Sequence, residues 1–205
     1  MESGMRKYRS TPKGNFGFSL IELLVALAVL MILAAIFTPL MSTAISGMKL
    51  RYSSTNLSGL MQKARIEAAR KNTFYSVRQT TSSAGNVTYY VDLNKNNSYS
   101  SGDPILEMGS QVSLHFGIGS GAPSETAFAG SLGFALDSSG VLPSFNARGL
   151  PCILSASTCP QVPGQGFVYF LSRQNTLGTG WASVVVTPSG RVQVWSYDGA
   201  NWNQI

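Results

Sequence analysis

Gly17-Phe18-Ser19-Leu20-Ile21-Glu22 opens an apolar stretch that continues to Met41 and decides how this chain is built. Within this stretch, Glu22 is the only residue with an ionisable side chain. A helix rises about 1.5 Å per residue, so the stretch is long enough to cross a bilayer. A carboxylate near the centre of a membrane helix costs roughly 2.5–3.5 kcal/mol, and less near the interface, which indicates that Glu22 has a function.

The residues before the apolar stretch are basic, with Arg6, Lys7, Arg9 and Lys13 in the first 17 positions. The positive-inside rule therefore predicts that residues 1–17 are cytoplasmic and that the rest of the chain is exported. A secretory signal peptide has a similar layout, and Ser42-Thr43-Ala44 resembles its cleavage site. That alternative predicts a secreted β domain, but the length of the apolar run and the early carboxylate favour a retained helix.

The formal charge of +6 is unevenly distributed. Lysine and arginine concentrate between Lys49 and Arg78, whereas the chain from residue 79 onward is slightly acidic. Such a basic stretch suits DNA or anionic lipid headgroups, but it also suits the solvated face of a helix. Both interpretations stay open on the sequence.

Apolar residues recur at spacings of three and four beyond the apolar stretch, which predicts one long helix from Phe18 to about Asn72. Pro39, Gly47 and Gly59 should loosen it locally. Two apolar stripes define its expected buried face, namely Met41, Ala44, Ile45, Met48 and Tyr52, followed by Leu57, Leu60, Met61, Ala64 and Ala68.

The remainder of the chain is rich in short β-type runs. A hairpin is expected from residues 74–78 and 87–91 around Ala84-Gly85-Asn86, and a terminal hairpin turn at residues 188–190. Further strands are predicted at 105–108, 112–116, 132–136, 166–171, 182–187 and 192–197. The fold class is therefore α+β, with a long N-terminal helix packed on a mainly antiparallel β-sheet head.

The run from Gly17 to Glu22 resembles the class III signal of type IV pilins and pseudopilins. The resemblance implies that a prepilin peptidase cuts between Gly17 and Phe18 and that Phe18 is N-methylated. Pro39 lies where many pilins have a helix-loosening proline. Since a buried, unpaired carboxylate is costly, we expect Glu22 to pair with the amine of a neighbouring Phe18 during assembly.

The order of helix, β-rich head and closing hairpin, with Gly190-Arg191 at its corner, is similar to the GspH/FimT family of minor pseudopilins. The resemblance implies a single-pass protein of the bacterial inner membrane with a periplasmic head, later near the tip of a pilus or pseudopilus. Its partners would be other pilins, the prepilin peptidase and the inner-membrane assembly platform. The expected segments are a leader (1–17), a transmembrane and assembly half-helix (18–41), an amphipathic half-helix (42–73) and a head (74–205). Type IV pili and type II secretion systems share this signal, so both stay open.

The chain has two cysteines, Cys152 and Cys159, in a segment flanked by prolines. In an exported chain this spacing predicts a small disulfide-closed loop, with two free thiols as the alternative. Two cysteines and the distant His115 are too few ligands for structural zinc, and no cofactor is expected.

The segment from Asp92 to Asp103 has the spacing of an EF-hand calcium loop, with Asp92, Asn94, Asn96 and Asp103 as candidate ligands. It departs from the pattern because Asn97 replaces the turn glycine and Asp103 replaces the bidentate glutamate. A polar turn is therefore the favoured interpretation over a weak calcium site.

Gly190-Arg191-Val192-Gln193 resembles the Gly-Arg-x-Arg motif through which some FimT-like pilins are thought to hold DNA, although Gln193 replaces the second arginine. Arg191, Trp195 and Tyr197 are the candidate residues of such a cationic, stacking surface. An ordinary strand with alternating apolar residues is the alternative.

No motif points to catalysis. His115 stands alone between apolar residues, no Gly-x-Ser-x-Gly elbow occurs, and no recognisable motif places two carboxylates together. We therefore predict a structural subunit without catalytic residues, and a DNA-binding subunit for natural transformation as the alternative.

Overall fold

The computed structural model describes residues 18–81, 87–109, 111–137, 139–155, 158–161, 163–175 and 178–205. Gly17 and the predicted turn at residues 84–86 lie outside the described residues, as does the side chain of Pro39. The chain divides into two compact units, Met1–Leu40 and Met41–Ile205, which we describe separately. The second unit is called the head below.

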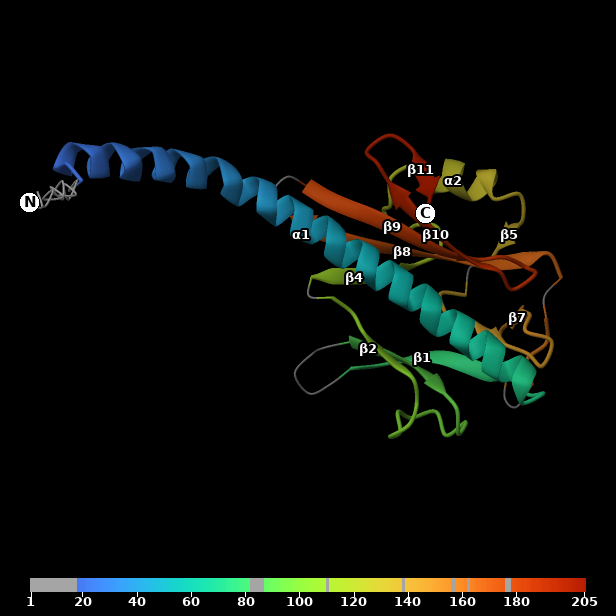
Figure 1. Cartoon of the computed structure of the whole chain (residues 1–205). Coiled ribbons are helices and arrows are strands. Elements are labelled where there is room, and N and C mark those ends of the chain that lie inside the picture. The colour runs from blue at the N-terminus through green and yellow to red at the C-terminus, as the bar shows by residue number, and fades with distance from the viewer. Residues whose placement is uncertain are drawn as a thin grey trace, which may run out of the picture. The chain divides into compact units, whose positions relative to one another are not determined.

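Two helices and eleven strands make up the described structure (Figure 1). The helices are α1 (Leu20–Arg70) and α2 (Glu125–Ser131). The strands are β1 (Tyr75–Thr81), β2 (Val87–Asp92), β3 (Ile105–Glu107), β4 (Val112–Phe116), β5 (Ala135–Leu136), β6 (Ser144–Phe145), β7 (Pro151–Cys152), β8 (Gln165–Asn175), β9 (Gly178–Val186), β10 (Val192–Tyr197) and β11 (Trp202–Gln204).

In the first unit, the described part of α1 is apolar along Leu20–Thr38, with a mean hydropathy of 3.0. This segment is long and apolar enough to cross a membrane, and its large side chains are exposed. An exposed apolar helix surface of this length is suited to the hydrocarbon core of a bilayer.

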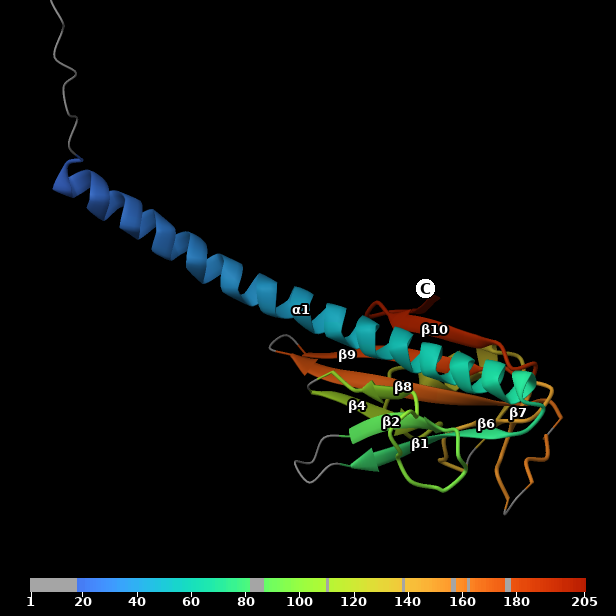
Figure 2. The same ribbon diagram turned by 60° about the horizontal axis from the view of Figure 1, so that its bottom comes forward.

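The head contains two sheets, and Figure 2 shows the head part of α1 running across their strands. One sheet has the strand order β3-β2-β1-β6-β7, and the other has the order β11-β10-β9-β8-β4, with β5 added in parallel to β8. All other pairs are antiparallel, as expected for strands joined by short turns. The predicted α+β class is confirmed.

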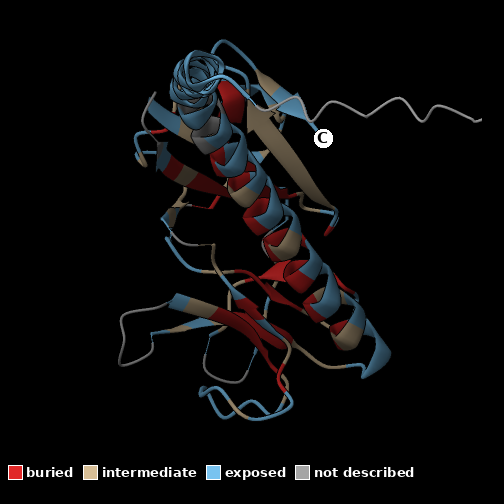
Figure 3. Cartoon of the chain, turned by 60° about the vertical axis from the view of Figure 1, so that its left-hand side comes forward, coloured by how far each residue is buried: buried red, intermediate tan, exposed pale blue. Residues whose placement is uncertain are grey.

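The main core of the head lies between α1 and both sheets. Leu57, Met61 and Ala64 are fully buried on one face of the helix (Figure 3). On β8, Phe167, Tyr169 and Leu171 join this core, whereas the alternate residues Val168 and Phe170 face the opposite side. The two-residue repeat of a strand therefore buries both faces of β8.

A second core covers the other face of the β8–β9–β10 sheet. Phe128 of α2 stacks on Trp202 with ring centroids 4.8 Å apart and contacts Trp195 at 5.3 Å. Trp202 Nε1 donates a hydrogen bond to the Pro123 carbonyl at 2.9 Å, which ties β11 to the segment before α2. This aromatic cluster fixes α2 on the sheet.

One predicted helix face is wrong. The first stripe is exposed in the head, including Met48 at 70% and Tyr52 at 63%, and small polar residues such as Ser53 and Ser54 are buried instead. Their hydroxyls are satisfied, since Ser54 donates to the Arg51 carbonyl and Ser53 accepts from the Gly109 amide. Small side chains let the helix approach the sheets closely at this level. The second stripe, from Leu57 to Ala68, is buried as predicted.

Most strand predictions are confirmed, including the first hairpin and the turn at residues 188–190, where the Gly190 amide bonds to the Thr187 carbonyl. The predicted strand at residues 132–136 is wrong over most of its length. Helix α2 occupies the preceding residues, and the Leu132 amide donates to the Ala129 carbonyl at its end. Within the predicted range, only Ala135–Leu136 form a strand.

Candidate functional sites

Glu22 lies in the first turn of α1, close to Phe18, the first described residue. The Phe18 side chain is 83% exposed. An acidic residue in the first turn is favourable because the helix dipole is positive there. The placement leaves Glu22 near the start of the apolar segment, where a carboxylate costs less than at its centre.

Four arginines meet around a cavity of about 670 Å³ on the head, which we call the arginine pocket. They come from three parts of the chain: Arg65 and Arg70 from α1, Arg148 from the turn before β7, and Arg191 from the turn between β9 and β10. The other lining residues are Gln62, Ile66, Ala69, Gly149 and Val192.

Two glycines hold the arginine pocket together. The Arg65 Nε donates a hydrogen bond to the Gly149 carbonyl at 3.1 Å. Gly149 and Gly190 have φ angles of +71° and +80°, and a Cβ on Gly190 would lie 2.3 Å from the Gly149 oxygen. Only glycine permits this close approach at that backbone conformation.

The charge of the arginine pocket is mostly unbalanced. Arg70 pairs with Glu67 at 2.7 Å. Within the described parts of the chain, Arg65, Arg148 and Arg191 have no carboxylate partner. Guanidinium groups that share a cavity with apolar residues such as Ile66 and Val192 suit an anion that also carries a flat or apolar part.

The sequence missed this arrangement because its arginines are far apart in the chain. It placed Arg191 with Trp195 and Tyr197, and the structure corrects this. Trp195 packs in the second core against Phe128, and Tyr197 packs against Trp202 at 5.3 Å. Their rings are used for packing, so Arg191 faces the arginines of the pocket and not a stacking surface.

Comparisons with known proteins agree with the geometry of the first unit. A family model described as "Prokaryotic N-terminal methylation motif" matches residues 12–38. A "Pilin-like protein PilA1" from Thermus thermophilus is 35% identical over 106 residues, which is 52% of this chain and 63% of that protein. Over these segments the chain is similar to type IV pilin-like proteins. No solved structure matches it.

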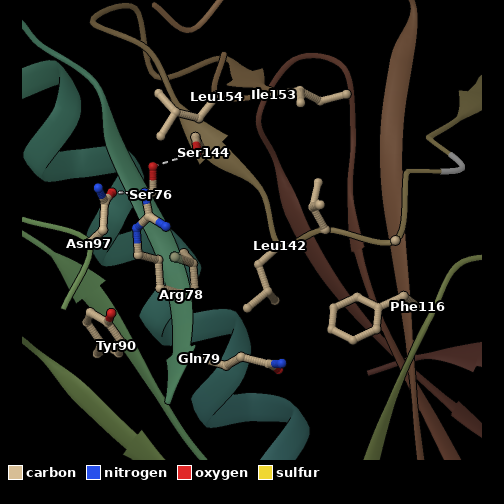
Figure 4. Close-up of a pocket in the computed structure, with 13 residues that line it drawn as sticks. Ser76, Arg78, Gln79, Tyr90, Asn97, Phe116, Leu142, Ser144, Ile153 and Leu154 are labelled. Carbon is tan, nitrogen blue, oxygen red and sulfur yellow. Dashed lines mark hydrogen bonds between the residues drawn. The ribbon is translucent and has the colours of Figure 1, made fainter. Parts of the chain in front are cut away.

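The head has a second cavity, of about 620 Å³, which we call the inter-sheet cavity (Figure 4). One side is polar, with Ser76, Arg78 and Gln79 of β1 and Asn97 beside them. The other side is apolar, with Phe116 at the end of β4 and Leu142, Ile153 and Leu154 from the connecting segments. Burial, together with the nearby Asp92 carboxylate, raises the pKa of Tyr90, which also lines this cavity.

The loop that resembles an EF-hand is tied to its own backbone. Asp92 accepts from the Asn96 and Asn97 amides at 3.2 and 3.0 Å and from Arg78 Nε at 3.1 Å. Asp103 accepts from the Leu93 and Ser100 amides at 3.2 and 2.8 Å. Among the described residues no group of three His, Cys, Asp or Glu side chains could hold a metal. The hydrogen bonds favour the polar-turn interpretation.

The predicted disulfide is present. Cys152 and Cys159 are bonded with their Cα atoms 5.3 Å apart, and they close the segment that leaves β7. His115 is half-buried on β4, where its Nε2 lies 2.8 Å from the Ser172 hydroxyl and its ring contacts Trp181. It therefore has a packing role in the sheet.

Proposed function

We propose that this pilin-like chain is a membrane-anchored minor pilin or pseudopilin, a structural subunit of a type IV pilus or a type II secretion pseudopilus. The observation that carries the proposal is Glu22 at the start of the apolar helix, inside the segment that matches the methylation motif. Pilin-type subunits are structural, so no catalytic residue is required.

The same placement supplies a mechanism for assembly. A prepilin peptidase would cut between Gly17 and Phe18, leaving a methylated amine on Phe18. In a filament the apolar helices leave the bilayer and pack together, and an unpaired Glu22 carboxylate there would be costly. Pairing with the Phe18 amine of a neighbouring subunit offsets that cost and fixes the axial register.

Substitution of Glu22 tests this role. We expect Glu22→Ala to leave leader processing intact and to reduce surface filaments strongly, whereas the neighbouring control Leu23→Ala should assemble normally. N-terminal sequencing of the mature chain reports processing, and electron microscopy reports filaments. A mature start near Ile45, or unchanged filaments with Glu22→Ala, would contradict the proposal.

The finer assignment concerns the place of the subunit in the filament. A helix followed by a mainly antiparallel head with the Gly190–Arg191 corner supports a GspH/FimT-type subunit of the initiating or tip complex. The head would be periplasmic, and the partners would be other pilins and the inner-membrane assembly platform. Co-purification of the chain in substoichiometric amounts with filaments would support this place, and bulk abundance in the shaft would exclude it.

The arginine pocket favours a second candidate, a DNA-binding subunit for natural transformation. It supplies three cations without carboxylate partners in the described residues, which offsets the missing second arginine at Gln193. Phosphate contacts of this kind give salt-dependent affinity. The apolar lining residues Ile66 and Val192 would contact the nucleobases or sugars of a single strand.

Mobility shift of a single-stranded oligonucleotide by the full chain in detergent tests the second candidate. We expect Arg191→Ala and Arg148→Ala each to weaken binding and to lower the salt slope by about one. Arg51→Ala, on an exposed α1 residue outside the pocket, is the matched control. Equal losses in all three variants would point to non-specific charge, and no shift would eliminate the candidate.

A further inference from the structure

Strand β1 has one edge that is only partly covered. On one side it pairs with β2 over Ser76–Thr81. On the other side it pairs with β6 at only two residues, Tyr75 with Phe145 and Ser76 with Ser144. The Val77 amide still donates to the Pro143 carbonyl at 3.2 Å, and no further main-chain hydrogen bond joins the two segments within the described residues.

The end of this pairing has a cause in the sequence. Pro143 has no amide hydrogen, so it accepts a hydrogen bond from Val77 but returns none, and the ladder ends there. Main-chain groups in a strand point alternately to its two sides, so those of Gln79 point to the same side as those of Val77. Within the described parts of the chain, no strand pairs with Gln79 on that side.

The open edge borders the inter-sheet cavity. Figure 4 shows the Gln79 side chain of β1 directed toward Leu142 and Phe116, whereas the Arg78 side chain is directed toward Asn97. Phe116 ends β4, which is itself the last strand of the second sheet. A strand edge and an apolar wall therefore face each other across a cavity of about 620 Å³.

We propose that the inter-sheet cavity binds an extended peptide segment of a partner protein, which pairs with the open edge of β1. A main chain that offers both an amide and a carbonyl at one position is complemented by another strand, since each would otherwise lack a protein partner. The alternate side chains of the incoming strand would lie against Leu142, Phe116 and Ile153, so apolar residues at every second position are expected.

The charge of the cavity lining indicates which residue the partner peptide should carry. Of the described residues that line the cavity, Arg78 is charged and no carboxylate is among them. Arg78 pairs with Asp92 and also donates to Asn97, but the Asp92 side chain is only 2% exposed, whereas the Arg78 side chain is 29% exposed. A carboxylate on the incoming strand opposite Arg78 is therefore favoured over a cation. The proposal concerns the head alone and holds whether or not the chain assembles into a filament.

Gln79→Pro is the sharpest variant for this site. Proline removes the Gln79 amide, which points to the open edge, while Arg78 and Thr80, whose main-chain groups point to β2, keep that pairing. Gln79→Ala changes the side chain and retains the amide, so it is the matched control. An unchanged urea midpoint for both variants shows that the head remains folded.

The probe is a fluorescent hexapeptide of alternating valine and polar residues with one central glutamate, added to the full chain in detergent. We expect binding by fluorescence anisotropy, and slower hydrogen exchange of the Gln79 amide by NMR. The same peptide methylated at the amides facing β1 should lose about tenfold or more in affinity, because the edge hydrogen bonds cannot form. Replacement of its glutamate by lysine should also weaken binding.

The outcomes separate strand pairing from simple apolar adhesion. Binding lost in Gln79→Pro and retained in Gln79→Ala supports the proposal. Equal binding of the methylated and unmethylated peptides would overturn it, and this arm does not depend on how any variant folds. A peptide that leaves Gln79 exchange unchanged at about 1 mM would overturn it as well, because an affinity weaker than that is too low for a specific strand site.

Discussion

Gly190→Ala tests the packing that assembles the arginine pocket. The added Cβ would meet the Gly149 carbonyl oxygen at 2.3 Å and Arg65 Nε at 3.1 Å. The neighbour at 2.3 Å is main chain and cannot rotate away, so either the turn or the segment before β7 must move. Such a movement would also strain the Arg65–Gly149 hydrogen bond.

Two terms set the size of the effect. A non-glycine residue at a φ of +80° costs about 1–2 kcal/mol, and forced repacking around a new methyl group costs about 1–3 kcal/mol. The expected loss is therefore roughly 2–5 kcal/mol of the free energy of unfolding. Gly164→Ala is the matched control, since Gly164 has a φ of +74° but no atom within 4 Å of its added Cβ. Gly164→Ala should lose only the cost of a non-glycine residue at positive φ, about 1–2 kcal/mol of the free energy of unfolding.

Urea unfolding of the full chain in mild detergent measures the difference. All three tryptophans pack in the second core of the head, so their fluorescence reports unfolding of the head and not of the apolar segment Leu20–Thr38. With a slope of about 2 kcal/mol per molar urea, the Gly190→Ala midpoint should fall by about 1–2.5 M. Equal midpoint shifts for the two variants would refute the close approach of the two turns.

Three further outcomes are expected from the same unfolding assay. Replacing both Cys152 and Cys159 by serine should cost about 2–3 kcal/mol, because the disulfide closes a short loop, and an unchanged midpoint would contradict this. Burial raises the pKa of Tyr89 from 10.0 to about 12, so the unfolded chain loses its proton first and stability should fall as pH rises from about 10 to about 12. Tyr89→Phe should weaken that fall, and identical pH profiles would exclude Tyr89 as its source. Phe128→Ala should cost about 3–5 kcal/mol by opening the aromatic cluster, and a loss below about 1 kcal/mol would show that α2 contributes little.

Local patterns were sufficient for most of the secondary structure. The apolar run after Gly17, the spacing from Leu57 to Ala68 and the β-type runs at residues 112–116 and 192–197 each predicted the element that forms. The cysteine pair was predictable for the same reason, since its members are only seven positions apart. In all these cases the interacting groups are close in the chain, so spacing alone constrains them.

Contacts between segments that are distant in the chain could not be predicted from local sequence patterns. The exposure of Met48 and the burial of Ser53 depend on how closely α1 approaches the sheets, and helical spacing does not encode that distance. The arginine pocket likewise exists because Gly149 and Gly190 let two turns touch beside Arg65. The sequence by itself determined the long apolar helix, the β-rich head and the disulfide. Only the tertiary structure decided which charges meet and which strand edge stays open, because those properties follow from packing between residues that are far apart in the chain.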